Sequence, residues 1–469
     1  MLKNIKKERV KSYVLLLLLF AVFGGMFAVF GVAICNDSAQ YIKMHIHREP
    51  LYPLFLWIFR TLFGTQWLNV VGVAQNILAA VCIWLFAEYV CKKFSLYFSE
   101  EIIIILLEMM PYFVTRYFSV LKIFMPNTIM SEAICMPLFM IFIIYCFEMF
   151  TEKQKEYRKA TVLALILALL LSLTRSQMMA TILVWMVVLL TRLLREKAVW
   201  RKKMARMCGV LLVVVLAFSL RLFVIKCYNL EFNGHFINNT YGGVNTLTNI
   251  LYASDRECGE YIQDDEAKGF FYIMYDMAEE RHATYHYAGD SLEEKVCYIE
   301  KWHDIIKYEI IEDTFYQTYR KTMAGDYIMI NLKADETAVE IIKGILPRCF
   351  ARWISNYFSL VCVGLIRSIA VMHPIVSWIA IFFYLLSVVM ALVIMRKKWK
   401  GKEENENAVW FLGLVLLAIL GNVFTVAITI MPLSRYMIYG FSPFYTAGWI
   451  LIITLARIWK KDRNEKVAK

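Results

Sequence analysis

The chain has 469 residues, of which 60% are hydrophobic and 19% are charged, and its formal net charge is +12. So apolar a composition excludes an ordinary soluble domain and indicates a multi-pass membrane protein. The positive charge does not indicate nucleic-acid binding, because the basic residues cluster between apolar segments, as orientation signals do, and no basic–aromatic RNA-binding motif or glycine-rich phosphate loop is present.

The N-terminal part begins with five Lys and Arg residues in 1–11, which we expect to remain in the cytoplasm. The first apolar segment, about 12–35, then runs outward and leaves residues 36–65 outside. Within this first outer loop the apolar and aromatic run Leu51–Phe63 is predicted to form a helix that lies at the membrane interface. Three further spans are predicted at about 67–90, 101–118 and 128–149.

Residues 160–193 are apolar except for Thr174 to Gln177 in the middle. One long helix would place the basic runs 153–159 and 192–206 on opposite sides of the membrane. A hairpin of two short spans keeps both runs in the cytoplasm, so we prefer it. The hairpin places Arg175 at the outer face.

A seventh span, about 207–225, leads to the large polar loop 226–349, in which 264–283 and 291–322 are predicted to be amphipathic helices. Phe350–Val371 has a short apolar core surrounded by arginines, and we interpret it as an interfacial or re-entrant helix. The last spans are predicted at about 374–395, 408–431 and 441–459.

The sequence therefore predicts an all-α polytopic membrane protein with about 10 (10–12) transmembrane helices, a large and mainly helical extracytoplasmic loop, and both termini in the cytoplasm. Three parts are expected: 1–225, an N-terminal transmembrane module that carries the catalytic residues; 226–349, an extracytoplasmic loop domain; and 350–469, a C-terminal transmembrane module.

The eleven cysteines include no C-x-x-C pair, so we expect no metal or redox site and no cofactor. Four of them, Cys227, Cys258, Cys297 and Cys349, lie in or at the end of the large polar loop. If that loop is outside the cytoplasm, disulfides among these four are allowed. Three pairings exist, and the sequence does not choose among them.

The stretch after the first span carries the clearest polar pattern. Asp37, Tyr41 and His45 are four residues apart, so a helix beginning here would place them on one face. Pro50 and Pro53 are expected to end that helix and turn the chain back.

Polar side chains from loops that are far apart in sequence are expected at one depth of the outer face. They are Asp37, Tyr41, His45, His47, Arg48, Arg116, Lys122, Glu132, Arg175 and Arg435. Simpler roles remain open for several of them. Asp37 and Glu132 each stand where a helix cap is favoured, the histidines suit a membrane interface, and Arg175 and Arg435 suit snorkelling to headgroups.

Two carboxylates and several cations at one membrane face suit the transfer of a sugar from a lipid phosphate. A carboxylate can take the proton of an acceptor hydroxyl, and arginine or histidine side chains can hold the leaving phosphate with charge-assisted hydrogen bonds. The polyprenyl tail of such a donor stays in the bilayer. No nucleotide-binding fold is then required, and the sequence has none.

Four motifs carry a family resemblance. They are Asp37-Ser38-Ala39-Gln40-Tyr41 followed by Glu49-Pro50-Leu51-Tyr52-Pro53-Leu54, then Met130-Ser131-Glu132-Ala133, Leu173-Thr174-Arg175 and Arg435-Tyr436. In order and position they resemble the GT-C superfamily of polytopic membrane glycosyltransferases, in its bacterial branch related to protein O-mannosyltransferases and aminoarabinose transferases. Arg48-Glu49 stands where many members have His-Pro, which leaves the donor sugar open.

The resemblance implies that Asp37 is the catalytic base and Glu132 the second acid. Tyr41, His45, Arg48, Arg175 and Arg435 are the residues expected to bind the donor phosphate. The implied reaction transfers a sugar from a polyprenyl-phosphate donor to a glycan or protein acceptor on the extracytoplasmic face. Neither acid stretch contains Asp-x-Asp, so we expect no metal.

Two other functions fit the same sequence. A polysaccharide polymerase or ligase of the cell envelope also has a large outer loop, but it would depend little on Asp37. A flippase or transporter of lipid-linked sugars would need charges inside its spans, and Glu108 is the main candidate.

Overall fold

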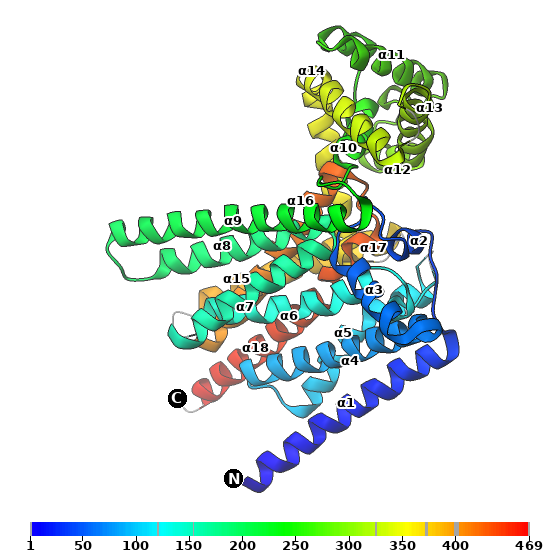
Figure 1. Ribbon diagram of the computed structural model, residues 1–469. Helices are drawn as coiled ribbons and strands as arrows, with labels where there is room; N and C mark the ends of the chain where they lie inside the picture. Colours follow the sequence, from blue (N-terminus) through cyan, green and yellow to red (C-terminus); the bar gives the residue numbers. More distant parts are fainter. Residues whose placement is uncertain are drawn as a thin grey trace. The chain divides into compact units, whose positions relative to one another are not determined.

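The computed structural model describes residues 2–119, 122–152, 154–323, 326–370, 374–397 and 403–467, and its elements there are helices (Figure 1). Over these residues the only β-type pairing is an isolated parallel bridge between Ala33 and Thr128. The chain forms two compact units. Unit 1 comprises Met1–Tyr228, Ile366–Asn422 and Met437–Lys469, and unit 2 comprises Asn229–Leu365 and Val423–Tyr436.

Unit 1 contains the longer apolar helices. They are α1 (Leu2–Phe30), α4 (Trp67–Lys93), α5 (Phe98–Tyr117), α6 (Glu132–Thr151), α7 (Gln154–Thr174), α8 (Ala180–Arg195), most of α9 (Trp200–Asn233), α15 (Pro374–Lys397), most of α16 (Glu403–Thr429) and α18 (Phe441–Val467). Two shorter helices, α2 (Ser38–Ile42) and α3 (Leu51–Phe63), follow α1. The predicted helix Leu51–Phe63 is thus present with the expected bounds.

Ten helical segments of the described residues are long and apolar enough to cross a membrane. They are Val10–Phe30, Leu51–Lys93, Glu132–Thr151, Glu156–Thr174, Ser176–Arg195, Trp200–Asn233, Tyr327–Ile369, Trp378–Arg396, Asn405–Thr429 and Ser434–Asn464. The predicted all-helical fold is therefore confirmed for the described residues, and the ten segments fit a multi-pass membrane protein.

Two of the predicted helices differ from these segments. The predicted span 101–118 is a helix, α5, but four charged residues, three of them glutamates, exclude it from the ten. The position of the predicted helix Phe350–Val371 relative to the membrane stays a prediction, but it is not a separate helix, because residues 350–369 belong to one continuous helix, α14 (Tyr327–Ile369). Its apolar second half extends a polar first half without a break, and this gives it a segment of spanning length. Val371 itself lies outside the described residues.

The hairpin predicted at Arg175 is confirmed. The helices α7 and α8 are separate, and the short 3-10 turn Ser176–Met179 joins them. The Trp185 indole on α8 donates a hydrogen bond of 3.0 Å to the Thr161 carbonyl on α7, so the two helices lie against each other. Arg175 stands in extended backbone at the bend, with φ −150°.

The helix ends of unit 1 sort into two groups. Arg195 at the end of α8 pairs with Glu406 near the start of α16, and Arg457 on α18 donates to carbonyls that follow α4. We call this group of helix ends the basic end. At the opposite ends of α1, α4, α6 and α7 lie Asp37, Glu132 and Arg175, and we call this group the site end. These contacts within unit 1 therefore place the two groups at opposite ends of its helices.

Unit 2 is built from shorter helices and most of α14, as far as Leu365. They are α10 (Gly242–Tyr252), α11 (Asp265–Glu280), α12 (Leu292–Asp304), a π-helix (Ile305–Glu312) and α13 (Asp313–Thr322). The helices predicted at 264–283 and 291–322 are thus present, although the second is α–π–α. Both begin at capping side chains, because Asp264 accepts the Ala267 N–H at 2.7 Å and Ser291 forms a capping box with Glu294.

Candidate active site

The backbone that follows α1 determines which residues meet at the site end. Gly31 takes a left-handed conformation (φ +59°) just after the helix, as C-terminal cap residues often do. The Ala33 N–H then donates to the Asn127 carbonyl at 2.8 Å, and the Ile129 N–H donates to the Ala33 carbonyl at 3.0 Å. The stretch that leads to Asp37 therefore runs beside the stretch that leads to Glu132.

Two neighbouring amides on α4 hold this crossing in place. The Gln75 amide donates to the carbonyls of Pro126 (2.9 Å) and Thr128 (3.0 Å), and the Asn76 amide donates to the Asn127 side chain at 2.8 Å. Gln75 is completely buried. Our sequence analysis missed both residues. The signal was present, since two adjacent amides inside an apolar span are unusual and mark interior polar contacts.

Asp37 is bound by Arg48 rather than by a helix. An Arg48 Nη2–H donates to Asp37 Oδ1 at 2.9 Å, and its Nε–H donates to Gln40 at 2.8 Å. The Asp37 side chain makes no capping hydrogen bond to α2, which removes the simpler capping role. Both charged side chains are about a quarter exposed, at 24% for Asp37 and 23% for Arg48. Asp37 is therefore within reach of an incoming molecule.

Glu132 is completely buried and is paired with Arg175. An Arg175 Nη1–H donates to Glu132 Oε2 at 2.6 Å and lies 3.2 Å from Ser131 Oγ. Glu132 is the first residue of α6, where the helix dipole favours a negative charge, but α6 has no side-chain capping hydrogen bond. Over the described residues its second oxygen, Oε1, has no hydrogen-bond partner. That oxygen is an available acceptor next to a cation.

Tyr41 joins the two acid–arginine pairs. Its hydroxyl is 2.9 Å from Ser131 Oγ, and the Arg48 guanidinium lies 4.8 Å from its ring centre. Burial raises the pKa of Tyr41, so its hydroxyl stays neutral and keeps its proton. A continuous chain of contacts therefore runs from Asp37 through Arg48, Tyr41 and Ser131 to Arg175 and Glu132. We call these six residues the site network.

A third acid–arginine pair lies in the same unit. Arg221, in the apolar part of α9, donates to Glu49 at 2.5 Å and to the Ser172 carbonyl at 3.3 Å, and the two charged side chains are each 7% exposed. Glu49 directly follows Arg48, so this pair anchors the chain beside Arg48 to α9. The sequence analysis did not single out Arg221, although an arginine within an apolar span is itself a signal of an interior partner.

His45 does not share a helix face with Asp37 and Tyr41, which corrects our prediction. The helix α2 ends at Ile42, and Met44 takes a left-handed conformation (φ +56°) that turns the chain before His45. The His45 ring instead lies 4.5 Å from that of His47. Burial, helped by Arg48 and Lys43, lowers the pKa of His45, so this imidazole is uncharged at neutral pH.

The two prolines also act differently from our prediction. Pro50 and Pro53 do not end the earlier helix; they stand at the N-cap and in the first turn of α3. A proline is tolerated there because the N–H that it lacks would have no partner inside the helix.

Arg435 belongs to unit 2, whereas the site network consists of unit 1 residues. Its guanidinium donates to the Tyr436 hydroxyl at 2.6 Å. Its role toward a donor phosphate stays a prediction. Within the described residues no three His, Cys, Asp or Glu side chains lie close enough together to hold a metal ion.

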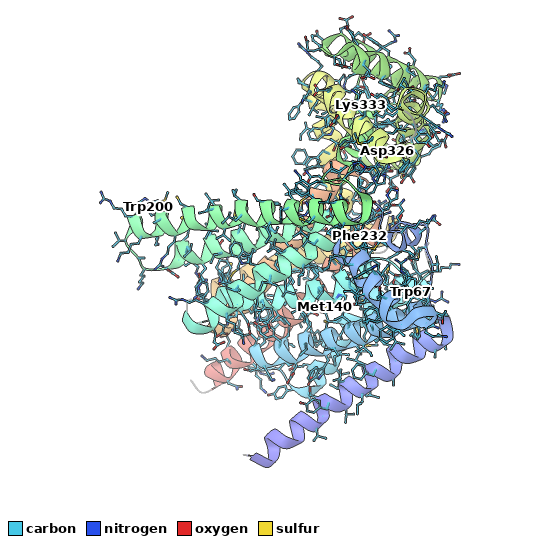
Figure 2. All side chains as sticks on the ribbon, viewed as in Figure 1. Trp67, Met140, Trp200, Phe232, Asp326 and Lys333 are labelled. Carbon is cyan, nitrogen blue, oxygen red and sulfur yellow. The ribbon has the colours of Figure 1, made fainter. Side chains whose placement is uncertain are left out.

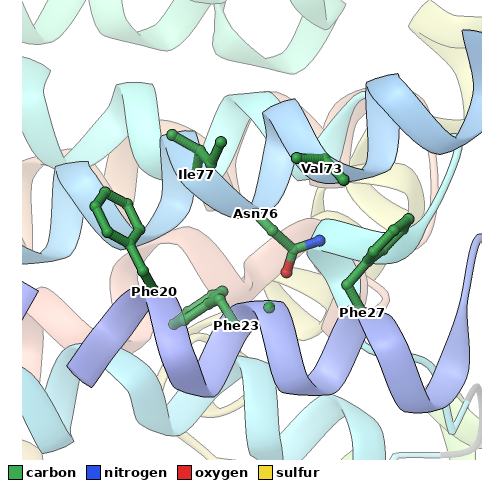
Figure 3. Close-up of a pocket in the computed structure, with 7 residues that line it drawn as sticks. Phe20, Phe23, Phe27, Val73, Asn76 and Ile77 are labelled. Carbon is green, nitrogen blue, oxygen red and sulfur yellow. The ribbon is translucent and has the colours of Figure 1, made fainter. Parts of the chain in front are cut away.

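An apolar slot lies between α1 and α4 in the same unit (Figure 3). Its volume is about 240 Å³, and Phe20, Phe23 and Phe27 of α1 face Val73 and Ile77 of α4 across it. Asn76, which holds the crossing near Glu132, also lines the slot, and its Oδ1 has no partner among the described residues. Val73 and Ile77 are more than 40% exposed (42% and 48%), so the slot opens on an apolar surface.

Comparisons with protein-family models, with curated proteins and with solved structures give no match to this chain. The functional assignment therefore depends on the geometry of the site network and on the motifs that form it.

Proposed function

We propose that this protein is a membrane glycosyltransferase that moves a sugar from a polyprenyl-phosphate donor to an extracytoplasmic acceptor, with Asp37 as the base. The observation that carries the proposal is the site network. It joins two carboxylates to two arginines at one end of the apolar helices, and each arginine already contacts an acid.

In the proposed reaction an acceptor hydroxyl attacks the anomeric carbon of the donor sugar. The new glycosidic bond forms, the bond between that carbon and the phosphate oxygen breaks, and the hydroxyl proton passes to the Asp37 carboxylate. The polyprenyl phosphate leaves with the bonding electrons. Arg48 and Arg175 stabilise the developing negative charge through charge-assisted hydrogen bonds.

This mechanism gives the Asp37–Arg48 pair a specific role. In the structure Arg48 occupies one oxygen of Asp37 at 2.9 Å. A donor phosphate competes for the same guanidinium, so donor binding frees Asp37 to accept a proton. Glu132 remains buried and holds Arg175 toward Ser131, which makes it a positioning residue in this scheme rather than a second base.

Two further features support a lipid-linked donor at an outer face. The slot between α1 and α4 suits an alkyl or prenyl chain, and Asn76 connects it to the crossing that precedes Glu132. An apolar slot alone is not specific, since another of about 250 Å³ lies between α6, α8 and α16 and includes Trp410. Arginines and lysines gather at the basic end, and the positive-inside rule would place that end in the cytoplasm.

Asp37→Asn provides the test, because it keeps the shape of the side chain and removes the base. We expect cells that express Asp37→Asn to lack one sugar in their lipid-linked or surface glycans, as cells without the protein do, when mass spectrometry compares them at equal protein level. The loss of a general base should lower the transfer rate about 10²- to 10⁴-fold. Glu88→Gln, at a surface ion pair on α4, is the matched control. Wild-type glycans in the Asp37→Asn cells would refute the proposal.

One observation favours a second candidate, a transporter of lipid-linked sugars. Glu108 lies in the middle of α5, is completely buried, and accepts the Thr446 hydroxyl of α18 at 2.7 Å. Buried acids within membrane helices often belong to ion or substrate pathways. If purified protein moved a lipid-linked sugar across liposomes without forming a glycosidic bond, and Glu108→Gln stopped the movement, this candidate would replace the first.

A further inference from the structure

Unit 2 contains a polar pocket that the proposed reaction does not use. It has a volume of about 200 Å³ and lies between the starts of α10 and α14, the end of the π-helix and α13. Its polar and aromatic lining includes Tyr241, Glu312, Tyr316, Tyr327, Asn331 and Asp335. Asp326 and Lys333, labelled in Figure 2, mark the first turns of α14 beside it.

Aromatic rings form part of the pocket wall. The rings of Tyr316 and Tyr327 lie 6.2 Å apart with a steep angle of 62° between their planes, and Tyr327 is 44% exposed. The Lys307 ammonium lies over the ring of Tyr241, 4.3 Å from its centre. Flat apolar ring faces therefore stand beside hydroxyl groups, a combination that favours ligands with both apolar and polar faces.

Two of the three carboxylates that line the pocket are already fixed as hydrogen-bond acceptors. Glu312 accepts the Tyr241 hydroxyl, and Asp335 accepts the Val244 N–H at 3.0 Å. A Cβ added at Gly243 would lie 2.5 Å from the Asp335 carbonyl oxygen, so only glycine lets α10 approach α14 this closely. The pocket is thus built by a specific close approach of two helices.

The π-helix is an independent sign of function. π-helical turns are rare and occur frequently at functional sites, because their wider turn costs stability. This one runs for eight residues, from Ile305 to Glu312, and its last residue lines the pocket. Two of its residues, Ile306 and Ile310, are completely buried, so side-chain packing holds the π-helix in place.

We propose that this pocket binds one ring of an uncharged saccharide. The apolar face of a sugar ring packs on a tyrosine ring, and sugar hydroxyls donate to carboxylate and amide oxygens such as those of Glu312 and Asn331. The described lining contains two further acids and no basic residue, which disfavours uronates and phosphates. Its size suits a single ring rather than a long chain.

The test measures binding without any donor, so it does not depend on the transfer reaction. The full-length protein in nanodiscs is studied by saturation-transfer difference NMR with the methyl glycosides of glucose, N-acetylglucosamine and glucuronate. We expect signals from at least one of the two neutral glycosides and none from glucuronate. Glu312→Gln and Tyr327→Ala should each weaken the affinity about tenfold, because the first removes a charged hydrogen-bond acceptor and the second removes an aromatic ring face.

The matched controls are Glu336→Gln and Tyr287→Ala, two exposed positions of unit 2 outside the pocket lining. They should bind the neutral glycoside as the wild type does. Three results would overturn the proposal: no signal from either neutral glycoside, equal binding in the wild type and both pocket variants, or displacement of the glycoside by putrescine at lower concentration than by the sugar itself. A failed transfer assay for Asp37→Asn would leave this result unaffected.

Discussion

Arginines at the two ends of unit 1 have different kinds of partner. At the basic end, Arg192 donates to the carbonyls of Met149, Phe150 and Glu152 where α6 ends, and Arg457 donates to the carbonyls of Phe94 and Ser95. At the site end, by contrast, Arg175 and Arg221 pair with acids that are 0% and 7% exposed.

The difference concerns how much each group of charges contributes to stability. A cation near the last turn of a helix satisfies carbonyls that have no partner inside it, and this stabilises the fold directly. A buried acid–arginine pair loses much of its attraction to desolvation, so well-packed apolar residues are often as stable in its place. The presence of the buried pairs at the site end is therefore weak evidence for a net contribution to stability.

The largest expected effect follows from breaking the Glu132–Arg175 pair. Arg175→Met leaves Glu132 buried without a counter-charge and should cost about 3–5 kcal/mol of unfolding free energy. Thermal unfolding in detergent measures the loss. Arg195→Met at the basic end, whose partner Glu406 is partly exposed, should cost less than about 1 kcal/mol.

The double variant Arg175→Met with Glu132→Gln sharpens this prediction. It removes both charges, so much of the stability should return while transfer stays absent. Equal destabilisation by Arg175→Met and Arg195→Met would contradict the distinction between the two ends.

An intermediate effect is expected at Gln75, which holds the crossing near Glu132. Gln75→Leu leaves the carbonyls of Pro126 and Thr128 and the Tyr52 hydroxyl without this partner, and should cost about 1–3 kcal/mol. Transfer should fall as well, because Ser131 follows that crossing directly. Asn69→Leu, at an exposed position of the same helix, is the matched control and should change neither quantity.

A smaller effect is expected at the basic end. Arg192→Gln removes donors to the carbonyls at the end of α6 and should cost about 1 kcal/mol. Glycan analysis of the cells should show wild-type transfer. Loss of transfer at normal protein level would mean that the basic end also takes part in the reaction.

The smallest effect concerns pH. The lowered pKa of His45 means that the unfolded chain takes up a proton first as the pH falls below about 6.5. The stabilising contribution of neutral His45 is therefore complete above that pH and declines on acidification. His45→Asn should flatten the fall in unfolding temperature between pH 7 and pH 5, relative to the wild type. An unchanged slope would show that folding does not lower the pKa of His45.

Much of the fold follows from local patterns along the chain. The apolar segments, the bounds of the helix Leu51–Phe63 and the hairpin at Arg175 were predictable, because hydrophobic length and basic runs act without reference to distant residues. The failures were also local in origin. Met44 takes a left-handed conformation, so α2 ends before it reaches His45. The helix α14 continues without a break from its polar half into its apolar half.

The sequence by itself determined that this is a helical multi-pass membrane protein, and that Asp37, Glu132 and Arg175 stand at the ends of apolar helices. Only the tertiary structure decided which partner each charge has. Three contacts depend on which parts of the chain become neighbours. They are the ion pair of Asp37 with Arg48, the ion pair of Glu49 with Arg221, and the hydrogen bond from the Gln75 amide to the Pro126 carbonyl. The physical reason is that a buried charge or amide must find its partner wherever packing brings one, and packing is set by the whole chain.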